Sequence, residues 1–107
     1  MEYIGKIEHD QKLCMGENGI VIFGAGGQLE NLLNKLENLH VRDKVVCICD
    51  NNPEKCGKEM EGIKIVGPEY AFSHYGDYLY IVYNQFRLEI CRQLADRKIQ
   101  RIHLIRD

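Results

Sequence analysis

The residues best suited to chemistry form a glycine-rich segment directly after an apolar run. Gly24, Gly26 and Gly27 follow four apolar residues, three of them β-branched. Glycine allows a backbone to turn tightly and to approach a ligand closely. A helix that begins after such a turn directs its unpaired N–H groups back toward the turn, which creates a binding site for phosphate. The segment therefore predicts an anion site at the start of the first helix.

Two polar positions follow other apolar runs and complete a candidate site. Asp50 lies at the end of residues 45–49, 26 positions after Gly24. In dinucleotide-binding folds, an acidic residue at the tip of the second strand accepts hydrogen bonds from ribose hydroxyls. Asn84 follows residues 78–83 and would line the same crevice. We expect a cofactor, NAD or NADP, to contact Gly24, Ala25, Gly26, Gly27, Gln28, Asp50, Asn51 and Asn84.

Leu29 stands where the dinucleotide-binding fingerprint has a third small residue, glycine or alanine. A small residue there allows the helix to pack closely on the strand. We therefore expect the helix to be pushed out, to tilt or to have a shifted start, with Gly27 compensating in part. A purely structural interpretation is also open, in which the glycines form a tight turn and Asp50 caps a loop.

The elements that must position these residues alternate between strands and helices. Apolar runs predict strands at residues 20–23, 45–49, 63–66, 78–83 and 101–105. Leucines spaced as one helical stripe predict an amphipathic helix from Leu29 to Leu39. Two further helices are expected at residues 68–75 and 84–98, and the polar residues 54–62 are expected to form a loop or a poor turn of helix. In the last helix, Asn84 would be the N-cap, and Phe86, Ile90 and Leu94 would face the core.

This alternation predicts an α/β fold. We expect a three-layer, Rossmann-like architecture with a mostly parallel sheet of about five strands and helices on both faces. The first strand should lie centrally, between the second and the fourth, which places the glycines at the topological switch point. Residues 19–107 would form this domain, and residues 1–18 an N-terminal extension or an edge strand.

Composition restricts the classes of partner. A chain of 107 residues fits one domain, and its net charge of −2 gives no electrostatic case for binding nucleic acid. No apolar run reaches the roughly 20 residues that cross a bilayer, and no secretion signal is evident. The five cysteines form no Cys-x-x-Cys pair, and no metal-ligand spacing is present, so we expect reduced thiols in a cytoplasmic protein without a metal site.

Three segments also carry a family resemblance: residues 20–26 (IVIFGAG), 50–55 (DNNPEK) and 62–69 (GIKIVGPE). They resemble the small Rossmann-like domains of bacterial surface-polysaccharide enzymes, which are found in nucleotide-sugar dehydratases and sugar acetyltransferases and attached to glycosyltransferases and methyltransferases. The resemblance covers about residues 19–105. It implies binding of NAD(P) or a nucleotide sugar, with Gly24, Gly26, Gly27 and Asp50 as the ligand contacts.

Three hypotheses on function follow. The first is a nucleotide-binding module, with NAD preferred to NADP because the Asp50 carboxylate would repel a 2′-phosphate. The second is a structural or interaction domain with a vestigial site, which forms a homodimer or belongs to a larger polypeptide. The third is an enzyme in its own right, but no acid, base or nucleophile can be assigned from the sequence, so we name no catalytic residue.

Overall fold

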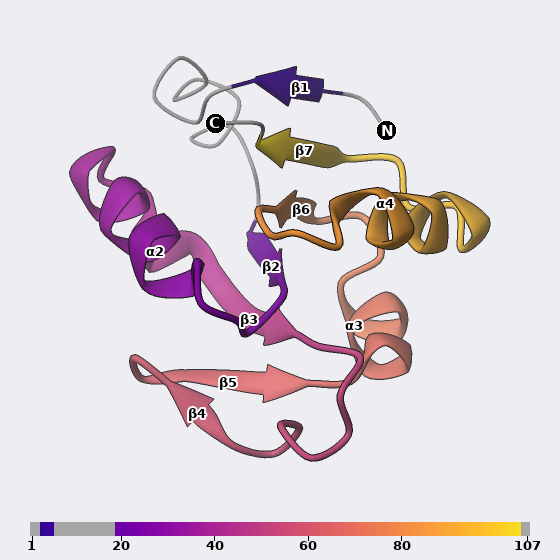
Figure 1. Ribbon diagram of the computed structural model, residues 1–107, viewed down its shortest axis with the longest axis horizontal. Coiled ribbons are helices and arrows are strands. Elements are labelled where there is room, and N and C mark those ends of the chain that lie inside the picture. Colours follow the sequence, from indigo (N-terminus) through magenta and orange to yellow (C-terminus); the bar gives the residue numbers. More distant parts are fainter. Residues whose placement is uncertain (1–2, 6–18, 106–107) are drawn as a thin grey trace.

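The computed structural model of the chain describes residues 3–5 and 19–105. Within them the chain forms a seven-stranded sheet with the order β1-β7-β6-β2-β3-β5-β4 (Figure 1). The strands are β1 (Tyr3–Gly5), β2 (Ile20–Phe23), β3 (Val45–Cys49), β4 (Glu59–Met60), β5 (Ile63–Val66), β6 (Leu79–Val82) and β7 (Ile102–Ile105). The helices are α2 (Leu29–Asn38), the 3₁₀ helix η2 (Arg42–Lys44), α3 (Pro68–His74) and α4 (Arg87–Asp96). In this sheet the strands pair in parallel, apart from the antiparallel pair β4 and β5.

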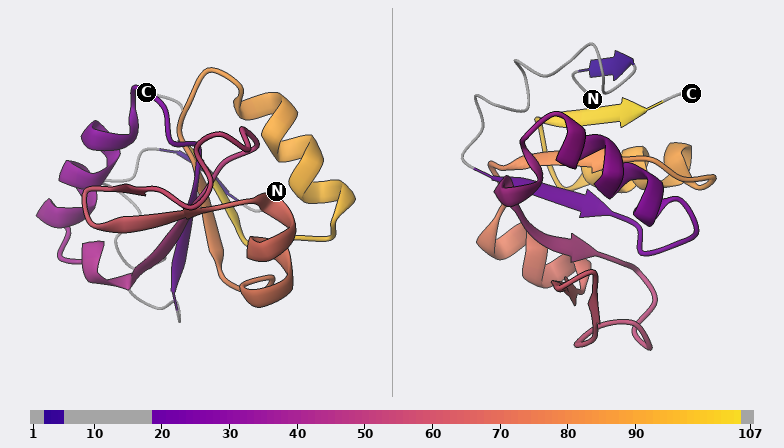
Figure 2. Two further views of the ribbon diagram at one scale, coloured as in Figure 1. Left: turned by 90° about the horizontal axis from the view of Figure 1, so that it is seen from below. Right: turned by 90° about the vertical axis from the view of Figure 1, so that its left-hand side faces the viewer.

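Helices cover both faces of the sheet (Figure 2). The four residues of β2 are buried and alternate between two cores, with Ile20 and Ile22 on the α2 side and Val21 and Phe23 on the side of α3 and α4. Such burial on both faces suits a central parallel strand. Four buried leucines attach α2 to its face of the sheet: Leu29, Leu32, Leu33 and Leu36. The predicted α/β, three-layer, Rossmann-like fold is therefore confirmed.

All five strands predicted from apolar runs are present, and β1 and β4 are additional. The prediction that residues 54–62 form a loop or a poor turn of helix is wrong for Glu59 and Met60, which form β4. This strand pairs with β5 through a turn at Glu61 and Gly62, whose φ angles of 54° and 80° match those of a tight hairpin. β1 pairs with β7 at the other edge of the sheet, and the rest of the predicted extension lies outside the described residues.

The last helix is shorter than predicted. α4 begins at Arg87, and its N-cap residue is Phe86, so the prediction that Asn84 is the N-cap is wrong. Phe86 was also expected on the inner face, but 59% of its surface is exposed. Ile90 and Leu94, one and two turns further along, are buried as predicted.

The order of the central strands creates the switch point. β2 lies between β6 on one side and β3 on the other, as predicted. The chain leaves β2 toward α2 on one face of the sheet and leaves β6 toward α4 on the opposite face (Figure 2). In open α/β sheets, ligands bind in the crevice outside the carboxyl ends of the strands at such a point.

Candidate functional site

A cavity of about 730 Å³ opens at the carboxyl ends of β2, β3 and β6. Three segments surround it: residues 24–28, here called the glycine loop, residues 50–57, here called the β3 loop, and residues 84–93 at the start of α4. Its lining residues are Phe23, Gly24, Gly26, Gly27, Gln28, Asp50, Asn51, Asn52, Lys55, Asn84, Gln85, Phe86, Glu89, Ile90 and Gln93. The structure therefore brings together the predicted site residues except Ala25, which is buried and does not line the cavity.

Gly24 is a glycine because the fold requires one. Its φ angle of +121° is a conformation that side chains disfavour. Its N–H donates to the Cys49 carbonyl at 2.7 Å, which ties the start of the glycine loop to β3. A Cβ at this position would lie 2.5 Å from Nδ2 of Asn84. Gly24 therefore serves the turn itself, whatever binds in the cavity.

At positions 26 and 27 the backbone does not require glycine in this way. Neither has a positive φ angle, and a Cβ built on either would meet nothing within 4 Å. Both are exposed and line the cavity. Within the described residues, the N–H groups of Gly26, Gly27 and Gln28 donate no hydrogen bond. Three backbone donors without a partner among the described residues thus belong to residues that line the same cavity.

Leu29 does not plug the cavity. It is 3% exposed and packs into the core between α2 and the sheet. The helix begins only at Leu29, whose N–H donates to the Gly26 carbonyl at 3.2 Å. Residues 26–28 therefore form a turn before the helix, which starts at Leu29, as the spacing of the leucines predicted.

Asp50 links the two loops. Its Oδ2 accepts the N–H of Ala25 in the glycine loop at 2.8 Å, and its Oδ1 accepts the N–H of Asn52 at 2.8 Å. The carboxylate thus fixes both loops. The bond to Asn52 agrees with the structural interpretation in which Asp50 caps a loop, whereas the bond to Ala25 was not predicted. Each carboxylate oxygen can accept a second hydrogen bond. Contact between Asp50 and a ribose hydroxyl stays a prediction.

Lys55 is a functional candidate that the residue-by-residue reasoning missed. Its Nζ donates to the Ala25 carbonyl at 3.1 Å, so both backbone groups of Ala25 are held by the β3 loop. Lys55 also lines the cavity and is the single basic side chain among the lining residues within the described part of the chain. Its charge therefore lies beside the free amides of the glycine loop, where a phosphate would be stabilised.

Asn84 is fixed by two hydrogen bonds to the backbone. Its Nδ2 donates to the Phe23 carbonyl and its Oδ1 accepts the N–H of Phe86, both at 2.9 Å. The side chain thus joins the end of β2 to the start of α4. It lines the cavity, as predicted, while its amide mainly holds the cavity wall in place.

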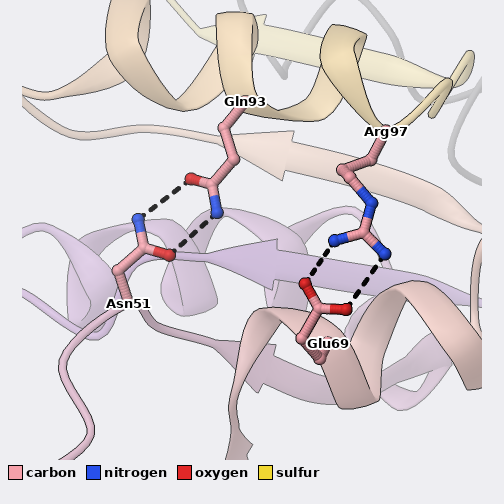
Figure 3. Close-up of polar contacts among 4 residues, drawn as sticks. All are labelled: Asn51, Glu69, Gln93 and Arg97. Carbon is pink, nitrogen blue, oxygen red and sulfur yellow. Dashed lines mark hydrogen bonds and ion pairs between the residues drawn. The ribbon is translucent and has the colours of Figure 1, made fainter.

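The α4 wall of the cavity carries one helical stripe. Phe86, Glu89, Ile90 and Gln93 follow the spacing i, i+3, i+4 and i+7, which places them on one face. At its far end, Gln93 exchanges two hydrogen bonds of 3.0 Å with Asn51 of the β3 loop (Figure 3). One turn further along, and outside the cavity, Arg97 forms an ion pair with Glu69 of α3 (Figure 3).

The lining of the cavity is rich in polar side chains that form hydrogen bonds. Six carboxamides line the cavity, and they can both donate and accept hydrogen bonds: Gln28, Asn51, Asn52, Asn84, Gln85 and Gln93. The thiols of β3 are poor nucleophiles, because burial raises the pKa of Cys47 to about 12 and also raises the pKa of Cys49. Among the described residues, no group of three His, Cys, Asp or Glu side chains is placed to hold a metal ion.

A known protein family matches the part of the chain that contains the whole of this site. The family described as "C2185-like, N-terminal" matches residues 16–105. The chain belongs to this family. The matched region runs from before β2 to the end of β7, so it contains both loops and the α4 wall. Among curated proteins, none matches the sequence.

A solved structure supports the fold. The chain is similar to the UDP-D-quinovosamine 4-dehydrogenase of Vibrio fischeri, with a TM-score of 0.63 over 85% of this chain and 80% of that chain. At 18% sequence identity, this likeness concerns the architecture alone. In the described part of the chain, no helix has the length and apolar character of a membrane span.

Proposed function

We propose that this chain is a nucleotide-binding module that holds NAD(P) or a nucleotide sugar across the carboxyl ends of β2, β3 and β6. One observation carries the proposal. Gly26 and Gly27 line the cavity, and among the described residues their N–H groups have no hydrogen-bond partner and neither backbone strain nor crowding requires glycine there. Glycine at such positions suits a ligand that must approach the backbone closely.

Each part of the ligand has a proposed partner. The diphosphate binds the amides of residues 26–28, and Lys55 supplies a positive charge beside them. Ribose hydroxyls donate to the remaining lone pairs of Asp50. The same carboxylate disfavours a 2′-phosphate, so NAD should bind more tightly than NADP. In this proposal Asp50 both fixes the loops and reads the ligand.

A setting in nucleotide-sugar or polysaccharide metabolism fits two observations. The sequence resembles small domains of surface-polysaccharide enzymes, and the fold is similar to that of a protein named as a UDP-sugar dehydrogenase. Free thiols at Cys47, Cys49, Cys56 and Cys91 agree with a cytoplasmic location. The module then binds the nucleotide, while the chemical step belongs to a partner or to a larger parent polypeptide.

Calorimetry tests the proposal directly. The full chain is titrated with NAD, NADP, a UDP-sugar and coenzyme A, each up to millimolar concentration. We expect saturable binding of NAD or the UDP-sugar, and weaker binding of NADP than of NAD. Absence of binding to all four ligands would contradict the proposed function. Tighter binding of NADP than of NAD would contradict the role given to Asp50.

A second candidate function, self-association through a vestigial Rossmann-like domain, is favoured by a partly exposed aromatic cluster around α3. Tyr70 is 44% exposed and stacks on His74 at 4.0 Å between ring centroids, and Tyr75 and Tyr78 extend the cluster. Such rings are common at interfaces. Light scattering tests this second function, because self-association predicts a mass that rises with concentration, whereas a monomer at all concentrations contradicts it.

A further inference from the structure

The α4 wall of the cavity offers a surface suited to a flat, polar ring. Phe86 lines the cavity and is 59% exposed, although an aromatic ring of this size is usually buried. Ile90 lies one turn further along on the same stripe, and Gln93 follows after another turn. Along this face of α4, the apolar side chains of Phe86 and Ile90 are therefore followed by the carboxamide of Gln93. Nucleobases combine the same features, because they have an apolar face and a hydrogen-bonding edge.

The carboxamide at the end of this stripe is already engaged. Asn51 Nδ2 donates to Gln93 Oε1, and Gln93 Nε2 donates to Asn51 Oδ1, both at 3.0 Å (Figure 3). Each amide thus presents one donor and one acceptor, side by side, to the other. The edge of a base presents the same pair: uracil has N3–H beside O4, and adenine has N6–H beside N1. Gln93 therefore offers Asn51 the hydrogen-bonding pattern that a base would offer.

We propose that Asn51 reads the edge of the ligand's nucleobase, and that Gln93 takes the place of the base on Asn51 when no base is bound. This inference rests on the proposed nucleotide site and adds its base subsite. The base would lie along the α4 wall, with its face toward Phe86 and Ile90. Gln93 then acts as an internal competitor, because a base must displace it before pairing with Asn51.

The exchange is feasible because the pair is at the surface. Asn51 is exposed and Gln93 is half-buried, so water can satisfy either amide during the exchange. Hydrogen bonds in such a setting add little net stability, since each replaces a bond to water. A competitor that occupies the site most of the time still lowers the apparent affinity by the fraction of protein that is blocked.

The test uses the full chain, three variants and three probes. Gln93→Leu removes the competitor, and Asn51→Leu removes the reader. Arg97→Met is the matched control, because it breaks the second tie of α4 without touching the cavity (Figure 3). The probes are UDP and ADP, which carry a base, and inorganic pyrophosphate, which does not. Affinities are measured by calorimetry, and circular dichroism verifies that each variant is folded.

The proposal predicts a base-dependent pattern. Gln93→Leu should bind UDP or ADP about three- to tenfold more tightly, the range of one exposed hydrogen-bond pair, with no change for pyrophosphate. Asn51→Leu should bind the same nucleotide more weakly, and Arg97→Met should match the wild type. The nucleotide that responds identifies the base. Equal affinities of wild type and Gln93→Leu for both nucleotides would overturn the inference while leaving the nucleotide site intact.

A measurement on the wild-type chain tests the displacement of Gln93 without any substitution. Nuclear magnetic resonance follows the side-chain NH₂ signals of Asn51 and Gln93 during titration with the responding nucleotide. We expect the Gln93 signals to move toward those of a solvated amide, while the Asn51 signals stay hydrogen-bonded. Unchanged Gln93 signals at saturation would also overturn the inference. If neither the nucleotides nor pyrophosphate bind, the proposed function fails, and the base subsite fails with it.

Discussion

The glycine loop and the β3 loop meet at one cavity but satisfy their polar groups in opposite ways. In the β3 loop, Asp50 accepts the N–H of Asn52, and Asn52 accepts the N–H of Glu54 at 3.0 Å. The Cys56 thiol lies 3.6 Å from the Asn52 carbonyl in a weak hydrogen bond. Within the described residues, residues 26–28 of the glycine loop donate no backbone hydrogen bond at all. The β3 loop is closed by hydrogen bonds among its own residues, whereas the glycine loop is open at residues 26–28, where the backbone N–H groups donate no hydrogen bond within the described part of the chain.

The difference shows how a loop with unbonded backbone donors can keep a defined shape. Backbone donors left free cost stability unless water or a ligand satisfies them. Here the free donors are next to Ala25, whose N–H and carbonyl are held by Asp50 and Lys55 of the β3 loop. The closed loop thus acts as a frame for the open one. Variants in the two loops test whether the β3 loop holds the structure while the glycine loop binds the ligand.

Gly24→Ala should have the largest effect on stability. The variant would force a side chain into a φ angle of +121° and displace Asn84 from its bond to the Phe23 carbonyl. We expect the free energy of unfolding to fall by about 3 kcal/mol. Urea denaturation measures this fall in the free energy of unfolding. An unchanged midpoint would show that the turn does not depend on glycine at this position.

Asp50→Asn should weaken the link between the loops. The amide can replace only one of the two acceptors that bind Ala25 and Asn52, and it lacks the charge. A loss of about 2 kcal/mol in the free energy of unfolding is expected. Asp43→Asn, at an exposed position of η2, is the control and should change stability by less than about 0.5 kcal/mol. Equal effects of the two variants would refute the linking role.

Lys55→Met should act on binding more than on folding. Removal of the charge beside the glycine loop should lower the affinity for pyrophosphate about tenfold at low salt, and less at high salt because of screening. Lys58→Met changes the charge equally, but Lys58 does not line the cavity, so it should bind like the wild type. Calorimetry at two salt concentrations measures these affinities. Identical losses of affinity in Lys55→Met and Lys58→Met would contradict the assignment of Lys55 to the phosphate site.

Asn52→Ala should have the smallest effect in this series. It removes one exposed bond within the β3 loop, to the N–H of Glu54, and leaves the Asp50 carboxylate in place. We expect a loss of about 0.5–1 kcal/mol in unfolding free energy and unchanged affinity for the nucleotide. A large loss of affinity would mean that this side chain belongs to the binding surface rather than to the frame.

Much of the fold could be predicted because its signals are local. The strands β2, β3, β5, β6 and β7 are apolar runs, and alternation of strands with helices fixes β2 between β3 and β6. The strand β4 could not be predicted, because its two exposed residues have no apolar pattern and depend on pairing with β5. Short elements of this kind are determined by tertiary contacts.

The C-terminal ends of α2 and α4 were predicted one or two residues too late, at Leu39 and Lys98 instead of Asn38 and Asp96, for a different physical reason. α2 and α4 both end with a residue in the left-handed conformation, His40 and Lys98, each with a φ angle of 62°. The next amides, of Val41 and Ile99, each donate 3.0 Å bonds back to the helix. This is a Schellman ending, which usually has glycine at the left-handed position. Without that glycine, the sequence lacks the usual stop signal.

In the candidate site, the sequence predicted which segments meet but not how they bond. Glycines and an acidic residue after neighbouring strands converge because the carboxyl ends of parallel strands share one edge. The contact of Lys55 with Ala25 spans 30 residues, and that of Asn51 with Gln93 spans 42. No local pattern encodes such pairs. They depend on where the β3 loop and α4 lie once the sheet has formed.

The double variant Gly26→Ala, Gly27→Ala tests the central claim most directly, because these two glycines have space for a side chain and no strained backbone. Urea denaturation and calorimetry with the nucleotide that binds the wild type are carried out on the same sample. We predict a free energy of unfolding equal to or above that of the wild type, since alanine restricts the unfolded chain. The affinity should fall at least tenfold, because the new methyl groups occupy the place of the phosphates. Wild-type affinity in a stably folded double variant would contradict the account.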